Sequence, residues 1–211
     1  MNATLITRVL CDFVPTGLKL DAVHLMGQTA DNQESVIARA VELIKADKFG
    51  CLTMFKEKIS GQPGGKIWEK EIRNRIGQVS IPIIQLSFPF IEGVNMSNTY
   101  GEAITVVSEA KSRGWKHIAI VAQPLHQLRS FLAFVTVVER DLPELKVYNI
   151  VGQSLSWSQR VVHSQGVLTG VRADLLQEEF SRVMKYQQIG DLVSEHTALQ
   201  YLNRRDDITV I

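Results

Sequence analysis

The chain has 211 residues, of which 45 % are apolar and 21 % charged, a composition that excludes disordered and low-complexity classes. Its 23 lysine and arginine residues balance 22 aspartate and glutamate residues, so net charge gives no reason to expect a nucleic-acid partner. No stretch approaches the roughly 18 apolar residues of a membrane helix, and residues 1–15 lack a signal-peptide core, so we expect a cytoplasmic protein without membrane insertion.

Strand and helix patterns alternate along the first half of the chain. Short apolar runs at 22–26, 51–55 and 81–86 predict strands. Apolar residues at i, i+3, i+4 and i+7 predict a helix over 33–47, and a second helix is expected over 67–76. Strands that alternate with helices imply crossover connections and a mostly parallel sheet.

The same alternation continues beyond a long loop. A helix is expected from about 99 to 113, where Thr99 and Glu102 form a capping-box pattern and Asn98 offers an alternative cap. Strands at 117–122 and 146–151 enclose a helix over 125–140. The sequence therefore predicts an α/β fold, a three-layer Rossmann-like sandwich with about five strands.

The last third has a different character. Residues 152–170 are rich in Ser, Gln and Gly, and helices follow at about 173–189 and 191–202, the second with Asp191 as its expected cap. We expect one domain over 1–211, with a Rossmann-like core over 20–151 and a mainly helical extension over 152–211. Cys11 and Cys51 are too few for a disulfide scaffold and are interpreted as packing residues.

Standard catalytic motifs are absent: there is no Walker loop, dinucleotide fingerprint, nucleophile elbow or paired metal-ligand spacing. Polar segments nevertheless follow three strands, at 27–32, 95–102 and 123–129. Ligands bind at the carboxyl ends of parallel strands, where helix N-termini attract anions. His126 and Arg129 lie three residues apart and share a helix face, where Arg129 can hold phosphate or carboxylate and His126 can transfer a proton.

Each of these residues also has a structural interpretation. Thr99 and Glu102 can serve only as a helix cap, and His126 only as a hydrogen-bonded structural residue. Arg129 can be an ion-paired group, and Arg39 can lie on the polar side of its helix. The sequence leaves both interpretations open.

Taken in order, several segments resemble a known family over roughly residues 20–150. They are Met26-Gly27; Arg39, Ala40 and Leu43; Ser60-Gly61; Glu69 or Glu71; Ser97 to Ala103; and His126 to Ser130. The family is that of the domain of unknown function 218, which includes YdcF-, SanA- and ElyC-like bacterial proteins. Because a membrane helix is not expected here, the chain resembles the soluble YdcF-like branch.

The resemblance implies a Rossmann-like fold and a pocket built from Asn98, Thr99, Glu102, His126 and Arg129. It also implies S-adenosylmethionine or a phosphorylated envelope precursor as ligand classes. Our first hypothesis is an enzyme or binding protein for an anionic, nucleotide-like small molecule. The expected residues are Glu102 and His126 as a charge-stabilised acid–base pair, with ligand contacts from Gly27, Gln28, Asn32, Arg39, Gly61, Asn98, Thr99 and Arg129.

The alternative hypothesis is a non-catalytic regulatory or scaffold module with the same fold. The surroundings of Glu102 and His126 distinguish the two hypotheses. Glu102 and His126 buried against each other would favour a scaffold, whereas both side chains on the wall of an open pocket would favour ligand binding. Whether the chain is an enzyme, and whether it forms a homo-oligomer, stay open at this point.

Overall fold

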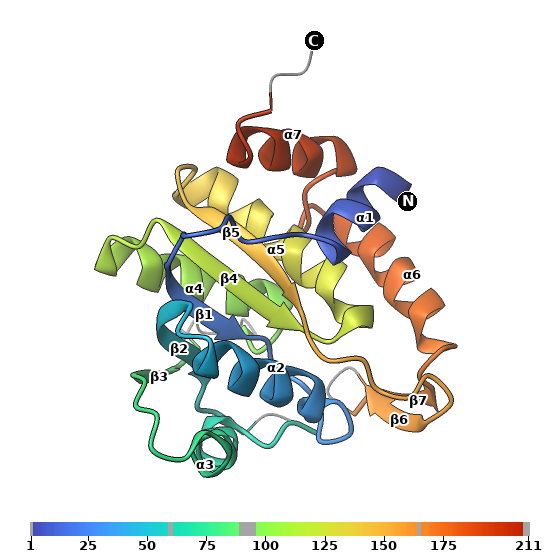
Figure 1. Ribbon diagram of the computed structural model, residues 1–211. Helices are drawn as coiled ribbons and strands as arrows, with labels where there is room; N and C mark the ends of the chain where they lie inside the picture. The colour runs from blue at the N-terminus through green and yellow to red at the C-terminus, as the bar shows by residue number, and fades with distance from the viewer. Residues whose placement is uncertain (1, 59–60, 89–95, 164–165, 209–211) are drawn as a thin grey trace.

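A five-stranded parallel sheet forms the centre of the molecule (Figure 1). The computed structural model describes residues 2–58, 61–88, 96–163 and 166–208. The strands lie in the order β3-β2-β1-β4-β5, and they are β1 (Leu20–Leu25), β2 (Phe49–Phe55), β3 (Ile83–Leu86), β4 (His117–Ala122) and β5 (Lys146–Val151). The predicted α/β Rossmann-like sandwich is confirmed, and each expected strand of the sheet is present within two residues of its expected start.

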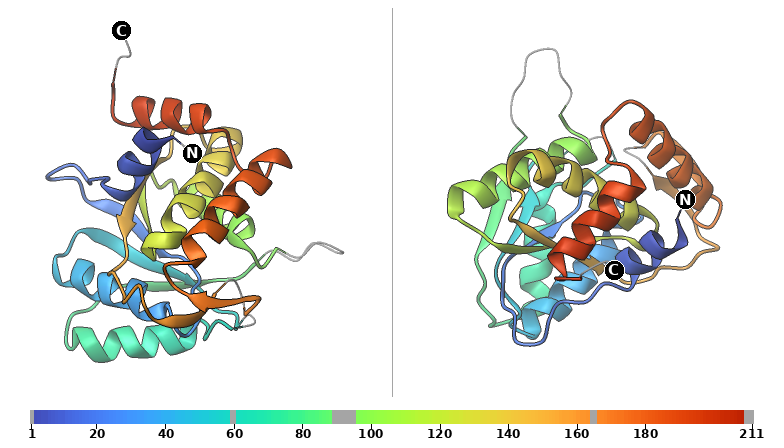
Figure 2. Two further views of the ribbon diagram at one scale, coloured as in Figure 1. Left: turned by 90° about the vertical axis from the view of Figure 1, so that its right-hand side faces the viewer. Right: turned by 90° about the horizontal axis from the view of Figure 1, so that it is seen from above.

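Helices cover both faces of this sheet, as Figures 1 and 2 show. They are α2 (Gln33–Lys45) and α3 (Gly65–Ile76) on one face, and α4 (Thr99–Arg113) and α5 (Pro124–Asp141) on the other. Alternate residues of β1 explain the two cores, because successive strand side chains point to opposite faces. Val23 and Leu25 pack with α2 and α3, whereas Ala22 and Met26 pack with α4 and α5.

An N-terminal helix, α1 (Ala3–Leu10), was not expected from the sequence. Asn2 caps it by accepting hydrogen bonds from Thr4 N and Leu5 N. Eight residues rarely form a helix alone in water, and the packing of Leu5 and Val9 against the α4–α5 core stabilises this one. Helix α1 lies beside α7 (Glu195–Arg205), so the first and last helices of the fold are in contact (Figure 2).

The segment after β5 contains an antiparallel hairpin, β6 (Arg160–His163) and β7 (Leu168–Val171), which the composition of 152–170 did not indicate. Two four-residue strands are marginal without further contacts. The loop after β1 supplies them, since Asp31 Oδ2 accepts from Val162 N (2.7 Å) and Thr29 Oγ1 donates to Val162 O (2.7 Å). The C-terminal segment is therefore attached to the carboxyl edge of the main sheet.

Two helices complete the C-terminal segment, α6 (Leu175–Gln188) and α7. Helix α7 begins four residues later than expected, and its cap is Ser194, whose hydroxyl accepts from Thr197 N, rather than Asp191. None of the described helices has both the length and the apolar character that a membrane span requires. Cys51 is buried in the core as expected, whereas Cys11 is exposed.

Candidate functional site

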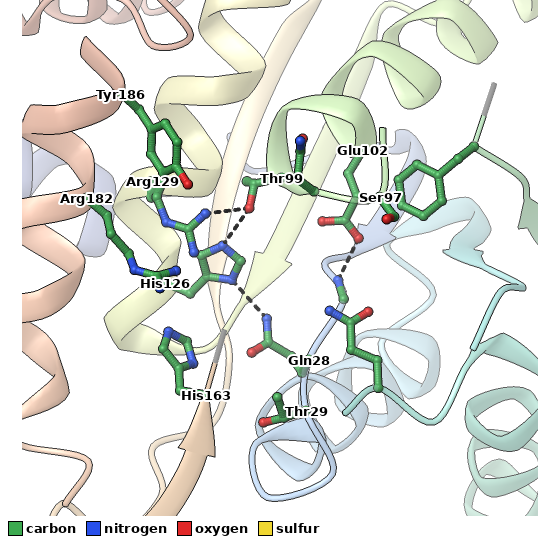
Figure 3. A pocket seen from close by; sticks show the side chains of 14 residues that line it. Gln28, Thr29, Ser97, Thr99, Glu102, His126, Arg129, His163, Arg182 and Tyr186 are labelled. Carbon is green, nitrogen blue, oxygen red and sulfur yellow. Dashed lines mark hydrogen bonds between the residues drawn. The ribbon is translucent and has the colours of Figure 1, made fainter. Parts of the chain in front are cut away.

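A cavity of about 120 Å³ lies at the carboxyl edge of the sheet, where β1 and β4 are neighbours. The chain leaves β1 towards α2 on one face and leaves β4 towards α5 on the other, so the two connections diverge and open a crevice. Figure 3 shows the side chains around it. The lining residues are Gly27, Gln28, Thr29, Gln62, Phe88, Ser97, Asn98, Thr99, Glu102, His126, Arg129, His163, Arg182 and Tyr186.

The first turn of α4 supplies one wall. Asn98 is its N-cap and accepts a hydrogen bond from Gly101 N at 2.9 Å, which decides between the two expected caps. Gly101 is required there, because a Cβ atom at this position would lie 1.8 Å from Met96 O. With the cap assigned to Asn98, Thr99 and Glu102 lie on one helix face and turn towards the cavity (Figure 3).

Glu102 reaches across to the end of β1, where its Oε1 accepts a hydrogen bond from Gly27 N at 2.9 Å. A side chain at Gly27 would collide with Glu102 and Gln62, since a Cβ atom would lie 2.9 Å and 2.6 Å from their Oε1 atoms. Burial raises the pKa of Glu102 to about 7, against the opposing effects of the Gly27 N–H and the Arg129 charge. Glu102 can therefore gain or lose a proton near neutral pH.

His126, in the first turn of α5, is hydrogen-bonded through both ring nitrogens. Its Nδ1 lies 3.2 Å from Gln28 Nε2 and its Nε2 lies 3.2 Å from Thr99 Oγ1. Burial and the Arg129 charge lower the pKa of His126 well below 6.5, so the imidazole is neutral at physiological pH. The expected stabilisation of Glu102 and His126 by opposite charges is therefore wrong, because burial disfavours the charged form of both groups.

Arg129 forms a buried ion pair with Glu179. Its Nε and Nη2 donate to the two carboxylate oxygens of Glu179 at 2.7 and 3.2 Å, and its Nη1 donates to Thr99 Oγ1 at 2.6 Å. His163 Nε2 lies 3.0 Å from Glu179 Oε1. Burial opposes ionisation of Glu179, but Arg129 and His163 outweigh it and hold the pKa of this carboxyl well below 4.5.

Several site residues come from the C-terminal segment and were not predicted: His163 on β6, and Glu179, Arg182 and Tyr186 on α6. A signal for Glu179 was present in the sequence. The buried positions of α6 are Leu175, Glu179 and Val183, so a carboxylate stands at helical spacing in the inward-facing stripe. A buried carboxylate requires a cationic partner, which the fold supplies as Arg129.

The structure brings seven of the ten predicted site residues together around the cavity: Gly27, Gln28, Asn98, Thr99, Glu102, His126 and Arg129. Thr29, which was not predicted, also lines it. Three predicted ligand contacts lie elsewhere. Asn32 donates to Thr29 Oγ1 at 2.8 Å and accepts from the buried Arg172, which directly follows β7.

Arg39 and Gly61 also have structural partners outside the cavity lining. Arg39 Nε donates to Val151 O at 2.9 Å and its Nη1 to Glu42 at 2.5 Å. The carbonyl of Gly61 accepts from Ala30 N at 3.1 Å, which joins the loop after β2 to the loop after β1. Ser60, and residue 95 at the start of the second polar segment, lie outside the described residues.

Comparison with known proteins adds no assignment, since no family model, curated protein or solved structure matches this chain. Among the residues that the structure describes, no group of three or more His, Cys, Asp and Glu side chains is arranged to hold a metal ion.

Proposed function

We propose that the chain binds a small anionic molecule in the cavity at the β1–β4 crevice, with Glu102 as its proton-exchanging group. The observation that carries this proposal is the charge of the lining. Arg129 and Arg182 both line the cavity, and both lie within 4.0 Å of the buried carboxylate of Glu179. A wall that carries two guanidinium groups favours a phosphate or carboxylate group beside α5 and α6.

The acid–base role rests on position and protonation together. Glu102 is 5 % exposed and lies on the cavity wall, and its pKa of about 7 suits proton exchange at neutral pH. His126, neutral and hydrogen-bonded at both nitrogens, orients its neighbours instead of pairing with Glu102. This division of roles favours an enzyme.

The resemblance to the domain of unknown function 218 family enters as part of this proposal. It suggests S-adenosylmethionine, a nucleotide-like molecule or a phosphorylated envelope precursor as ligands, and each carries a carboxylate or phosphate that the arginines can hold. A regulatory or scaffold module is the second candidate. The observation in its favour is that Arg129 already pairs with Glu179 and so contributes to packing.

The experiment compares two cationic residues of α6. Arg182→Ala removes a lining charge, and Lys185→Ala removes an exposed charge less than one turn away. Both variants are titrated calorimetrically with inorganic phosphate, S-adenosylmethionine and a sugar nucleotide, guided by mass spectrometry of copurifying small molecules. We expect about tenfold weaker binding in Arg182→Ala and no change in Lys185→Ala. Equal affinities in both variants, or no binding of any anion by the unmodified protein, would contradict the proposal.

A further inference from the structure

Thr99 is the point at which the polar network of the site converges. Its Oγ1 receives the Nη1 hydrogen bond of Arg129 at 2.6 Å and lies 3.2 Å from Nε2 of His126. Both partners are buried, at 8 % and 5 % exposure, whereas Thr99 itself is partly exposed to the cavity. Figure 3 shows the hydroxyl between the guanidinium and the imidazole.

The direction of the hydrogen bond between His126 and Thr99 follows from Gln28. The amide nitrogen of Gln28 lies 3.4 Å from the carbonyl of Met26, which can only accept, so this end of the amide is the donor NH₂ group. The same nitrogen lies 3.2 Å from Nδ1 of His126, which must therefore accept. A neutral imidazole that accepts at Nδ1 carries its proton at Nε2 and donates it to Thr99.

The second histidine of the site repeats this arrangement. Nδ1 of His163 lies 3.3 Å from Nε2 of Gln123, and Nε2 of His163 lies 3.0 Å from a carboxylate oxygen of Glu179. A carboxylate accepts only, so His163 also carries a proton at Nε2. A glutamine amide places the proton of His126 and a carboxylate places that of His163, and each imidazole donates from Nε2 into the network beside Arg129.

A hydroxyl oxygen has two lone pairs and one proton. Arg129 and His126 occupy both lone pairs of Thr99 Oγ1, so the hydroxyl can take part in a further hydrogen bond only as the donor. We propose that Thr99 donates its hydroxyl proton to the ligand and so requires a hydrogen-bond acceptor at this point. The inference rests on the proposed function and narrows it: a phosphate, sulfate or carboxylate oxygen fits beside Thr99, and an ammonium group does not.

Arg129, His126 and Gln28 are positioning residues in this scheme, since they fix the hydroxyl without needing to touch the ligand. The charge-assisted bond from Arg129 also polarises the hydroxyl and strengthens it as a donor. The site would therefore bind S-adenosylmethionine through its carboxylate, and a phosphorylated precursor through its phosphate, at the same atom.

The first test needs no ligand. Long-range proton–nitrogen NMR reports which ring nitrogen of His126 carries the proton, and a His126→Gln variant assigns the signals. We expect protonation at Nε2. Protonation at Nδ1 would overturn the inference, because the hydroxyl proton of Thr99 would then be donated to Nε2 of His126 and not to a ligand.

The second test uses inorganic phosphate as the probe, with binding measured by calorimetry for the unmodified protein, Thr99→Ser and Thr99→Val. Serine retains the donor, so we expect an affinity within about threefold; valine has a similar shape without it, so we expect at least about tenfold weaker binding. Thermal unfolding confirms that each variant is folded. If Thr99→Val does not fold, the affinity of Thr99→Ser still tests the inference.

The outcomes separate this inference from the proposed function. Phosphate binding that weakens in Arg182→Ala but is unchanged in Thr99→Val would overturn the donor role and leave the anion site standing. A Thr99→Ser affinity as weak as that of Arg182→Ala would also overturn it, since the donor is present in that variant. Absence of phosphate, sulfate and carboxylate binding by the unmodified protein would contradict the proposed function itself.

Discussion

Burial favours the neutral form of two side chains on the cavity wall, Glu102 and His126. It raises the pKa of the Glu102 carboxyl to about 7 and lowers that of His126 well below 6.5. In each case the cause is the loss of solvation of the charged form. The consequence for chemistry is that Glu102 exchanges protons near neutral pH, while His126 serves as a fixed hydrogen-bonding group.

The raised pKa of Glu102 makes the stability of the protein depend on pH. Between pH 4.5 and about 7 the unfolded carboxyl has lost its proton and the folded one retains it. The folded state then binds more protons, so the free energy of unfolding falls as pH rises through this window. Across the whole window the loss is on the order of 3 kcal/mol.

Glu102→Gln removes this dependence, because a glutamine oxygen still accepts from Gly27 N without a charge. We expect the variant to be more stable than the unmodified protein above pH 7 and to lose its advantage below pH 4.5. Urea unfolding at a series of pH values measures the difference, with exposed Glu144→Gln as the control. A stability difference that does not change with pH would show that Glu102 titrates normally.

At the scale of elements, α6 completes a site that the Rossmann-like core begins. The helix places Glu179 against Arg129 of α5, and its next two turns carry Arg182 and Tyr186 into the lining. The β6–β7 hairpin adds His163 from the other side of the same carboxylate. The extension thus shapes the cavity directly as well as covering apolar surface.

Glu179→Gln tests this docking. The substitution leaves the Arg129 charge buried without its ionised partner, a situation that costs about 3–5 kcal/mol of folding free energy. Glu178→Gln, at the adjacent exposed position, is the matched control and should change stability by less than about 0.5 kcal/mol. Urea unfolding followed by circular dichroism compares the two. Equal effects would mean that Arg129 and Glu179 are solvated in solution.

At the scale of the whole molecule, the two ends of the chain are joined over β5. Asp12, which follows α1, accepts two hydrogen bonds of 2.6 Å from Arg205 of α7, and it also accepts from Asn149 N at 2.9 Å. The Arg205 guanidinium lies 4.7 Å from the centre of the Tyr148 ring. The ends are therefore held by a buried ion pair in addition to apolar packing.

Asp12→Asn should destabilise the whole domain, because Arg205 loses the negative charge of its buried partner and keeps Asp206, which is more exposed, as an ionised partner. We expect a loss of about 2–4 kcal/mol, seen as a lower urea midpoint with an unchanged slope. Asp207→Asn, at an exposed neighbouring position, should have almost no effect. If Asp12→Asn only accelerated hydrogen exchange in α1 and α7, these helices would unfold locally, without unfolding of the rest of the domain, and the expectation would be contradicted.

Local patterns in the sequence determined the elements and the fold class. The alternation of apolar strands with helices predicted the parallel sheet, and the polar start of α4 and of α5 predicted that Asn98, Thr99, Glu102, His126 and Arg129 lie at one edge. These features could be predicted because periodicity and capping depend on residues a few positions apart. The short helix α1 and the hairpin could not, because tertiary packing stabilises both.

Only the tertiary structure decided which polar groups meet. Glu179 lies 50 positions from Arg129 and Gln28 lies 98 from His126, yet these pairs fix the charge and the tautomer of the site. Likewise, Asn32 and Arg39 have polar patterns that suit a ligand, but neighbouring backbone and side chains already hold them. Burial and long-range hydrogen bonding set the protonation state of each side chain and decide whether it can contact a ligand. Both arise from the packing of distant segments. The sequence therefore determined where a site would form, and the folded arrangement determined what each of its residues can do.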